Sequence, residues 1–277
     1  MRKGRKGFHC LRDHCGSFAT FALNAFLFAL FVLSVAAPAF AACTGVIADR
    51  GPLLWRAAAE ERAVTLTYLG HSSFLIESPE GARIVTDYNG VHRARVTPDI
   101  VTMNNAHSTH FTELIEPGVA HVLRGWDPGG GMANHNLQYR DVRVTNVPTN
   151  VRGFGETRYN GNSIFVFNLG DLCIAHLGHL HHTLTESHLA ELGQIDIVLV
   201  PVDGSFTLNQ TEMIEVLRQV KAKIAIPMHV FTDATLARFL ARAGERGFGV
   251  RHAPQPRITV SRADLPEQPE ILVLPGR

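Results

Sequence analysis

Alternating apolar and polar positions predict many short strands through the middle of the chain. From Val64 onward, short runs rich in Val, Ile, Leu and Phe are separated by polar turns, as is typical of β-structure. The turn between two of these runs, at Asn168 to Asp171, predicts a hairpin. The runs are VTLTY, SFLIE, RIVT, DIVTM, HVL, DVRVTNV, SIFVF, DLCIA, DIVLV and KIAIP.

Helical periodicity enters only in the second half of the chain. Thr183 with Glu186, and Thr207 with Gln210, have the spacing of a capping box and precede segments with apolar residues at helical intervals. A third helix is predicted over Asp233 to Ala243. Strands first, followed by strands alternating with helices, predict a layered α/β protein with sheets that are at least partly antiparallel.

The first residues have the three parts of a secretory signal. A basic start precedes an apolar run from about Phe18 to Ala37, and small residues follow in APAFAAC. Cleavage after Ala41 fits the A-x-A rule, whereas processing as a lipoprotein at Cys43 is the alternative, and the apolar run is also long enough for an uncleaved anchor. We therefore expect an exported, periplasmic protein that contacts a membrane only if it is lipidated at Cys43 or left uncleaved.

This interpretation sets the domain boundaries and the charge. Residues 1–41 are the predicted signal peptide, residues 42–62 a lead-in, and residues 63–277 one domain that includes the proline-rich tail 254–277. Without the signal, 21 basic and 24 acidic residues remain, a net charge of −3. No basic surface is left that would favour nucleic acid as a partner. About 235 residues are enough to form one substantial core.

Histidines gather where the strand-like runs end. The stretch CIAHLGHLHHTLT, residues 173–185, holds His176, His179, His181 and His182, and further histidines follow other runs in LGHSS, NNAHSTH and MHV. Groups at the ends of neighbouring strands converge at one sheet edge. Because imidazole is the commonest protein ligand for zinc, the sequence indicates a metal site.

These residues resemble the metallo-β-lactamase superfamily, in particular its branch of ascorbate-6-phosphate lactonase-like and N-acyl-phosphatidylethanolamine phospholipase D-like hydrolases. The motifs that carry the resemblance occur in the family's order between about Val64 and Val250. It implies an αββα sandwich of two mixed β-sheets flanked by helices, with a metal site at the sheet edges. The motifs are YLGHSSFLIE, RIVTD, PDIVTMNNAHSTH, AHLGHLHHTLT, IDIVLVPVDG and IAIPMH.

The metal-ligand motifs depart from those of the resembled family. Its H-x-H-x-D-H motif corresponds here to residues 105–110, in which Asn105 and Thr109 replace a histidine and the aspartate. Asn150 stands where a further histidine is expected, and His179 replaces the bridging aspartate. His229 is as expected. These departures from the ligands of the resembled family argue against the usual two-metal centre.

We expect instead a single ion held by four histidines, His107, His110, His179 and His229. Neutral imidazoles favour Zn²⁺ and also suit Fe²⁺, Mn²⁺ or Ni²⁺. His181, His182 and Asp203 are the candidate catalytic residues, the two histidines as pocket-lining or proton-donating groups. For His71 in LGHSS, a role near the metal or in substrate contact is as plausible as a structural one. Asp87 is a candidate to orient a ligand histidine.

Two classes of function fit this site. The first is a metal-dependent hydrolase that activates water on an ester, lactone or phosphodiester of a small-molecule or lipid-derived substrate. The second is a degenerate, non-catalytic periplasmic protein that binds a metal or ligand through the same fold. Oxygen chemistry at a histidine-held iron is a third, weaker hypothesis. Metal content and turnover of generic substrates separate these hypotheses.

Overall fold

The computed structural model describes residues 62–104, 107–153 and 155–276. The predicted signal peptide and nearly all of the lead-in lie outside these ranges, so the predicted processing stays a prediction. Among the helices of the described part, none has the length and apolar character needed to span a bilayer.

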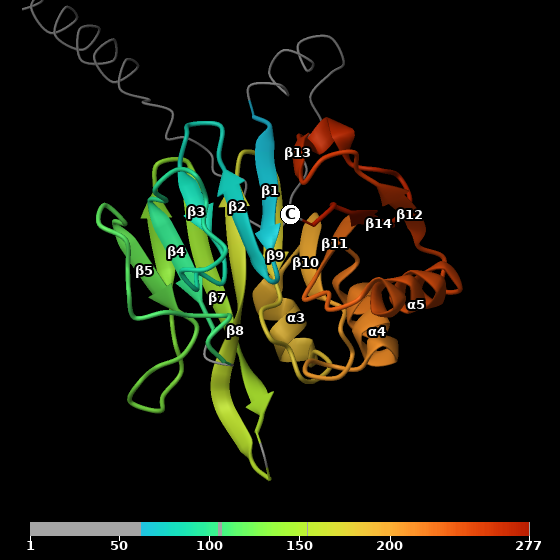
Figure 1. Ribbon diagram of the computed structural model, residues 1–277, viewed down its shortest axis with the longest axis horizontal. Coiled ribbons are helices and arrows are strands. Elements are labelled where there is room, and N and C mark those ends of the chain that lie inside the picture. The colour runs from blue at the N-terminus through green and yellow to red at the C-terminus, as the bar shows by residue number, and fades with distance from the viewer. Residues whose placement is uncertain (1–61, 105–106, 154, 277) are drawn as a thin grey trace, which may run out of the picture. The chain divides into compact units, whose positions relative to one another are not determined.

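The first sheet has six strands in the order β13-β1-β2-β3-β4-β5 (Figure 1). Pairing is antiparallel from β13 through β3 and parallel from β3 through β5, so the sheet is mixed. The strands are Val64–Gly70 (β1), Ser73–Glu77 (β2), Arg83–Val85 (β3), Ile100–Met103 (β4), His121–Arg124 (β5) and Arg257–Val260 (β13).

The second sheet has eight strands in the order β12-β14-β11-β10-β9-β8-β7-β6. Strands β6 to β9 pair antiparallel, and the others pair parallel. The hairpin predicted at Asn168 to Asp171 joins β8 to β9. The strands are Asn136–Tyr139 (β6), Val142–Arg152 (β7), Thr157–Leu169 (β8), Leu172–His176 (β9), Ile197–Pro201 (β10), Ile224–Met228 (β11), Gly249–His252 (β12) and Glu270–Val273 (β14).

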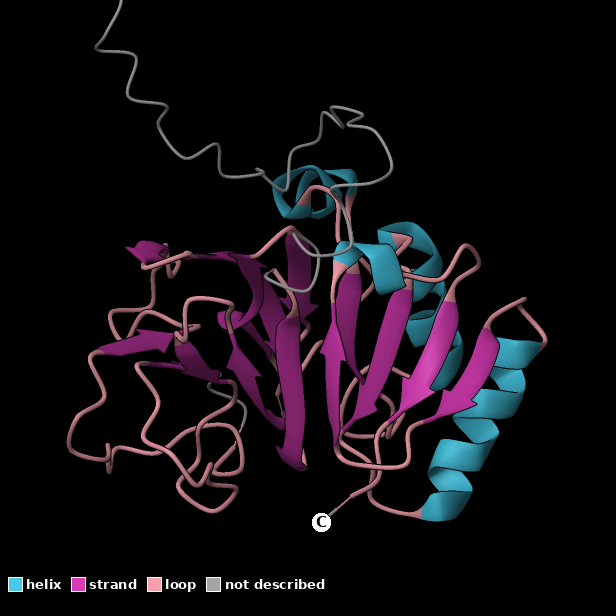
Figure 2. Cartoon of the chain, turned by 90° about the horizontal axis from the view of Figure 1, so that it is seen from above, coloured by secondary structure: helices cyan, strands magenta, loops and turns pink. Residues whose placement is uncertain are grey.

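Helices pack on the outer side of the second sheet, whereas loops lie on the side of the first (Figure 2). They are α3 (Glu186–Leu192), α4 (Gln210–Val220) and α5 (Asp233–Gly244), with a 3₁₀ turn, η1, at Arg262–Asp264. One apolar cluster fills the space between the sheets, and a second joins the eight-stranded sheet to the helices. A third cluster lies on the six-stranded sheet, and loop residues such as Phe111 and Trp126 pack against it. The predicted sandwich of two mixed sheets is confirmed.

Two helices begin slightly later than the capping pattern predicts. The N-cap of α3 is Thr185, whose hydroxyl accepts from the backbone of His188, and the N-cap of α4 is Asn209. Thr207 lies two residues before this cap, and its hydroxyl donates to Oδ1 of Asp203. Thr207 therefore contacts a carboxylate that lies beside the histidines.

Candidate metal centre

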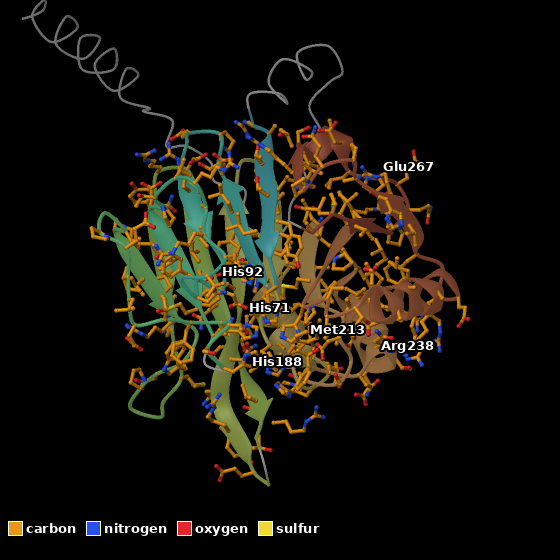
Figure 3. The ribbon with its side chains drawn as sticks, viewed as in Figure 1. His71, His92, His188, Met213, Arg238 and Glu267 are labelled. Carbon is orange, nitrogen blue, oxygen red and sulfur yellow. The ribbon has the colours of Figure 1, made fainter. Side chains whose placement is uncertain are left out.

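Five histidines meet at one edge of the two sheets. His71 follows β1, His107 and His110 follow β4, His179 follows β9 and His229 follows β11. Ligand atoms of His71, His107, His110 and His229 all lie within 4.8 Å of one another. Nε2 of His179 lies 3.2 Å from Nε2 of His107. The convergence predicted from the strand ends therefore brings all four predicted ligands together, and Figure 3 labels His71 within this region.

His110 is held by a buried carboxylate. Its Nδ1–H donates to Oδ2 of Asp87 at 2.6 Å, and the amide of Asn104 donates to the other oxygen of Asp87. Both His110 and Asp87 are fully buried, and burial raises the pKa of Asp87 to about 6. Because Nδ1 carries the proton, Nε2 presents a lone pair, the arrangement typical of a metal-binding histidine.

His229 is held in the same way by Asp203. Nδ1–H of His229 donates to Oδ1 of Asp203 at 2.9 Å. The other oxygen of Asp203 accepts from the backbone N–H groups of Ser205, Phe206 and Thr207. Burial raises the pKa of Asp203, but the hydrogen bonds from His229 and Thr207 outweigh it and hold the pKa well below its usual range. Asp203 therefore stays ionised and fixes the ring of His229.

Three buried imidazole nitrogens lack a partner within the described structure. Two are the Nε2 atoms of His110 and His229, which the two carboxylates leave unprotonated, and the third is Nδ1 of His181. A buried polar atom left unpaired costs about 1–3 kcal/mol. Two such atoms in one group of histidines fit a site in which a metal ion supplies the missing contact.

His107 and His179 complete the same pattern with neutral partners. Nδ1 of His107 lies 2.8 Å from the hydroxyl of Thr109, and Nδ1 of His179 lies 2.6 Å from Nε2 of His181. Their Nε2 atoms face each other at 3.2 Å. Two nitrogens on one tetrahedral zinc ion, each at about 2.0–2.1 Å, would be about 3.3 Å apart. The His107–His179 pair thus matches one edge of a tetrahedral site.

His71 is closer to the centre than sequence reasoning placed it. Its ligand atom belongs to the compact group of four, in which His179 is absent. However, Nε2 of His71 lies 2.8 Å from the hydroxyl of Thr109, so this nitrogen already has a partner. The ring centroid of His71 is 4.3 Å from that of His229. Its place directly after β1 in LGHSS was the only sequence signal for this position.

Unusual backbone conformations aim three of these side chains. His71, Asp87 and His229 have φ values of 53°, 42° and 57°, and they are three of the six non-glycine residues with positive φ in the described ranges. Non-glycine residues adopt this conformation at a cost of order 1–3 kcal/mol each. A backbone hydrogen bond of 2.7 Å from His229 to His71 ties two of them together. Strain of this kind concentrates at functional sites.

Four imidazoles of the centre, those of His71, His107, His110 and His179, have a lowered pKa and are neutral near pH 7. Burial, together with the charges of the neighbouring histidines, lowers the pKa of His71 to about 3. Burial likewise lowers the pKa of His107 and of His179, and it places the pKa of His110 well below the ordinary value. A histidine must be neutral to bind a metal ion, so this environment favours the ligating form.

Of the other histidines in the stretch 173–185, one contacts the centre and two make contacts elsewhere. His181 contacts His179, and its own Nδ1 is buried and lacks a partner among the described residues. His182 accepts from the backbone N–H of Asn150 and has its other nitrogen 2.8 Å from the carbonyl of Thr183, so both ring nitrogens are used away from the centre. His176 is buried, and its Nε2 bonds the carbonyl of Ser72. His176 thereby holds the loop after β9 against the turn after β1.

A pocket of about 630 Å³ opens beside the histidines, and we call it the histidine pocket. Two aromatic rings mark the neighbouring surface. Phe206 and Phe231 are 61% and 52% exposed, their centroids are 5.4 Å apart, and Phe231 also packs against His229. The centre is therefore accessible from a cavity with an apolar border. Its lining residues are His107, Val151, Arg152, Gly153, Glu156, Arg158, His179, His181, Ser205 and Phe206.

Residues 65–229 match the β-lactamase superfamily domain, so the chain belongs to the metallo-β-lactamase superfamily. A UPF0173 metal-dependent hydrolase of Carboxydothermus hydrogenoformans is 26% identical over 207 residues, covering 66% of this chain and 91% of the relative. Another, from Desulforamulus reducens, is 26% identical over 192 residues and covers 60% and 84%. The narrower branch suggested by the sequence motifs stays a prediction.

Solved structures show the same fold. A Thermotoga maritima protein assigned as a Zn-dependent hydrolase of this superfamily has a TM-score of 0.56 and 26% identity, covering 76% of this chain and 98% of that chain. The diiron β-hydroxylase CmlA of Streptomyces venezuelae has a TM-score of 0.50 and 12% identity, covering 72% and 54%. The second likeness concerns the fold alone, and it shows that this fold serves more than one reaction.

Proposed function

We propose that the protein is a metal-dependent hydrolase that uses one divalent ion held by His107, His110, His179 and His229. The observation that carries this proposal is the pair of buried Nε2 atoms of His110 and His229, each set opposite an Nδ1–H held by an aspartate. The relatives named as metal-dependent hydrolases support the same class of reaction. When bound, such an ion supplies an activated water as nucleophile near neutral pH.

The surrounding residues position this set and leave one side open. Asp87 and Asp203 orient His110 and His229, so Asp203 acts as a positioning residue and not as the catalytic residue predicted from the sequence. His182 supports the backbone of Asn150 and has no direct role in the proposed reaction. His181 orients His179 and lines the histidine pocket, so it is the only one of the three predicted catalytic residues that can contact substrate.

Zinc is the ion we expect, because four neutral imidazoles and no carboxylate ligand suit it best, while Fe²⁺, Mn²⁺ and Ni²⁺ remain compatible. The substrate class we propose is an ester, lactone or phosphodiester of a small molecule or lipid. The exposed Phe206 and Phe231 beside the centre support a substrate with an apolar part.

Turnover before and after metal removal tests the proposal. We would assay the full chain with 4-nitrophenyl acetate, a γ-lactone and bis(4-nitrophenyl) phosphate, in the zinc-loaded form and after chelation. Hydrolysis of at least one substrate should be lost on chelation, restored by zinc and absent in His110→Ala. A His188→Ala control should retain it. Unchanged background rates for all three substrates would reject the hydrolase.

A non-catalytic binding protein is the second candidate. It is favoured by Asn105, Thr109 and Asn150, which stand where the resembled family keeps three of its metal ligands. Under this reading the chain would bind one ion tightly and hydrolyse none of the three substrates. The same assay, together with metal content, therefore separates the two candidates.

Export is a separate proposal that rests on the first 43 residues. We expect the mature protein to begin near Ala42 in the periplasm. Mass spectrometry of the natively expressed protein should show removal of residues 1–41, or a lipid-modified amino terminus at Cys43. An intact Met1 on membrane-free protein would contradict export.

A further inference from the structure

One wall of the histidine pocket comes from the hairpin of β7 and β8. Because β8 runs antiparallel to β9, this hairpin turns at the same edge of the sheet at which His179 follows β9. The hairpin extends beyond the ends of the neighbouring strands (Figure 1). It brings Arg152, Glu156 and Arg158 to a pocket that His107, His179 and His181 also line.

The two arginines of this wall are not neutralised by the rest of the described chain. Six other arginines, such as Arg124 and Arg251, form ion pairs with carboxylates, but neither Arg152 nor Arg158 does so within the described ranges. Arg152 donates only to the backbone carbonyls of Ser205 and Thr207, at 3.3 and 3.5 Å. These long hydrogen bonds orient its guanidinium without cancelling its charge.

The two arginines face the same cavity as the histidines. Arg152 and Arg158 line the histidine pocket together with His179 and His181. Glu156 lines it as well, but within the described ranges it forms no ion pair with either arginine. An oxyanion in the pocket would therefore meet two guanidinium groups that no carboxylate of the described chain holds.

We propose that Arg152 and Arg158 form an anion subsite, and that the protein takes substrates carrying a carboxylate or phosphate group next to an apolar part. A guanidinium presents a planar set of donors that can grip either oxyanion with two parallel hydrogen bonds. Phe206 lines the same pocket and provides the apolar contact. Hydrolysis of such a substrate rests on the proposed hydrolase function. Binding of its carboxylate or phosphate group by the two arginines does not.

Calorimetric titration of the full chain tests this subsite without relying on turnover. The probes are phenylphosphonate and benzoate, with benzyl alcohol as the neutral comparison. Each is titrated into zinc-loaded protein and into chelator-treated protein, because an anion that binds only the metal loses its affinity on chelation. The relative affinities of the first two probes show whether a phosphate or a carboxylate is preferred.

The decisive variant is Arg152→Gln/Arg158→Gln. We expect its dissociation constant for the preferred anion to rise at least tenfold in the chelated form, with metal content unchanged. Arg158→Gln alone should give part of this loss, and it keeps the test valid if the double variant folds poorly. Arg143→Gln is the matched control. Arg143 lies on β7, as Arg152 does, but it contacts Asn136 and does not line the pocket. Higher salt should weaken anion binding to the unmodified chain, because exposed charges are screened.

Three results would overturn the subsite: absence of binding for both anions, equal affinity in the double variant, or an equal loss in Arg143→Gln. Failure of the hydrolase would look different. In that case anion binding would depend on the arginines as described, while no substrate is turned over. Hydrolysis that depends on metal but is indifferent to Arg152 and Arg158 would leave the hydrolase standing and reject the subsite.

Discussion

The two halves of the histidine cluster are built differently. In the floor, which we define as Asp87, His110, Asp203 and His229, each histidine is fully buried and bonded to a carboxylate. In the rim, defined as His107, Thr109, His179 and His181, the partners are a hydroxyl and another imidazole, and His107 is exposed. In the floor, the carboxylates fix the proton on Nδ1, so the lone pair of each histidine is on Nε2. In the rim, the hydroxyl and the imidazole partners can each donate or accept, so the protons can change places. We infer that the floor determines metal affinity and the rim determines access and reactivity.

The largest effect should follow from removing a floor histidine. His110→Ala or His229→Ala deletes a ligand and removes the imidazole N–H from which Asp87 or Asp203 accepts. We expect bound metal to fall from about one ion per chain to below about one tenth after desalting. Elemental analysis of each purified variant measures this directly.

His188→Ala is the control for the floor variants. His188 belongs to α3, where its Nδ1 accepts from the backbone N–H of Thr185. Its removal should leave metal content unchanged. Full metal content in both His110→Ala and His229→Ala would contradict the assignment of the floor as the anchor.

Removing a carboxylate while keeping its histidine should have a smaller effect. Asp87→Asn or Asp203→Asn no longer fixes the tautomer of the ligand, and loss of such partners costs about 10–100-fold in metal affinity. Asp203→Asn should also lower the free energy of unfolding more than Asp87→Asn, since Asp203 accepts from three backbone N–H groups. Competition with a zinc indicator gives the affinities, and urea unfolding gives the stabilities.

Asp127→Asn provides the comparison for these two variants. Asp127 also accepts from backbone N–H groups, but it is exposed in the loop between β5 and β6 and does not line the histidine pocket. It should bind zinc as the unmodified chain does. Equal affinities for zinc in Asp87→Asn, Asp203→Asn and the control would mean that the carboxylates are not needed to orient the ligands.

A rim substitution should distinguish the two candidates for the fourth ligand. We expect His179→Ala to weaken zinc binding by about tenfold or more, while His71→Ala changes it little, because Nε2 of His71 is engaged by Thr109. The reverse order of effects would replace His179 by His71 in the ligand set. The same indicator titration, run on both variants side by side, decides between them.

The smallest expected effect is a change of stability with pH in the metal-free protein. The pKa of His71 is about 3 in the folded chain but ordinary in the unfolded chain, so only the unfolded chain takes up this proton as the pH falls below about 6.5. Stability should therefore decline from pH 6.5 toward pH 3, and His107, His110 and His179, whose pKa values are also lowered, act in the same direction. The raised pKa of Asp87 opposes this, because the folded chain binds its proton more tightly from about pH 6 downward.

The measurement is the midpoint of urea unfolding at about pH 7.5 and about pH 5. The histidines outnumber Asp87, so we expect the lower midpoint at the lower pH. An equal or higher midpoint at pH 5 would show that the cluster is not held neutral by burial.

The sequence predicted the fold and the convergence of the histidines because both follow from strand order. Apolar runs locate strands, and parallel neighbours place their following residues at one edge, which is how His179 after β9 and His229 after β11 could be associated. His107 follows β4 of the other sheet. The β8–β9 hairpin was predicted from the composition of its turn, and the span of α5 from its apolar periodicity. These local patterns are sufficient for both features.

The roles of Asp203 and His71 depend on features that no local pattern contains. Asp203 was predicted to be catalytic, but its oxygens accept from His229 and from the backbone and hydroxyl of Thr207. The positive φ angles of His71 and Asp87 aim their side chains inward, and neither residue type indicates such a conformation by itself. These arrangements arise from tertiary contacts between segments distant in sequence.

The central claim is that one ion, and not two, occupies this centre. Elemental analysis of the full-length protein, purified without chelators and without a histidine tag, measures this most directly when combined with protein quantitation. We predict about one equivalent of a single transition metal, with zinc in excess over iron, manganese and nickel. Two equivalents per chain, or a content near zero after addition of Zn²⁺, Fe²⁺ and Mn²⁺ at neutral pH, would contradict the claim.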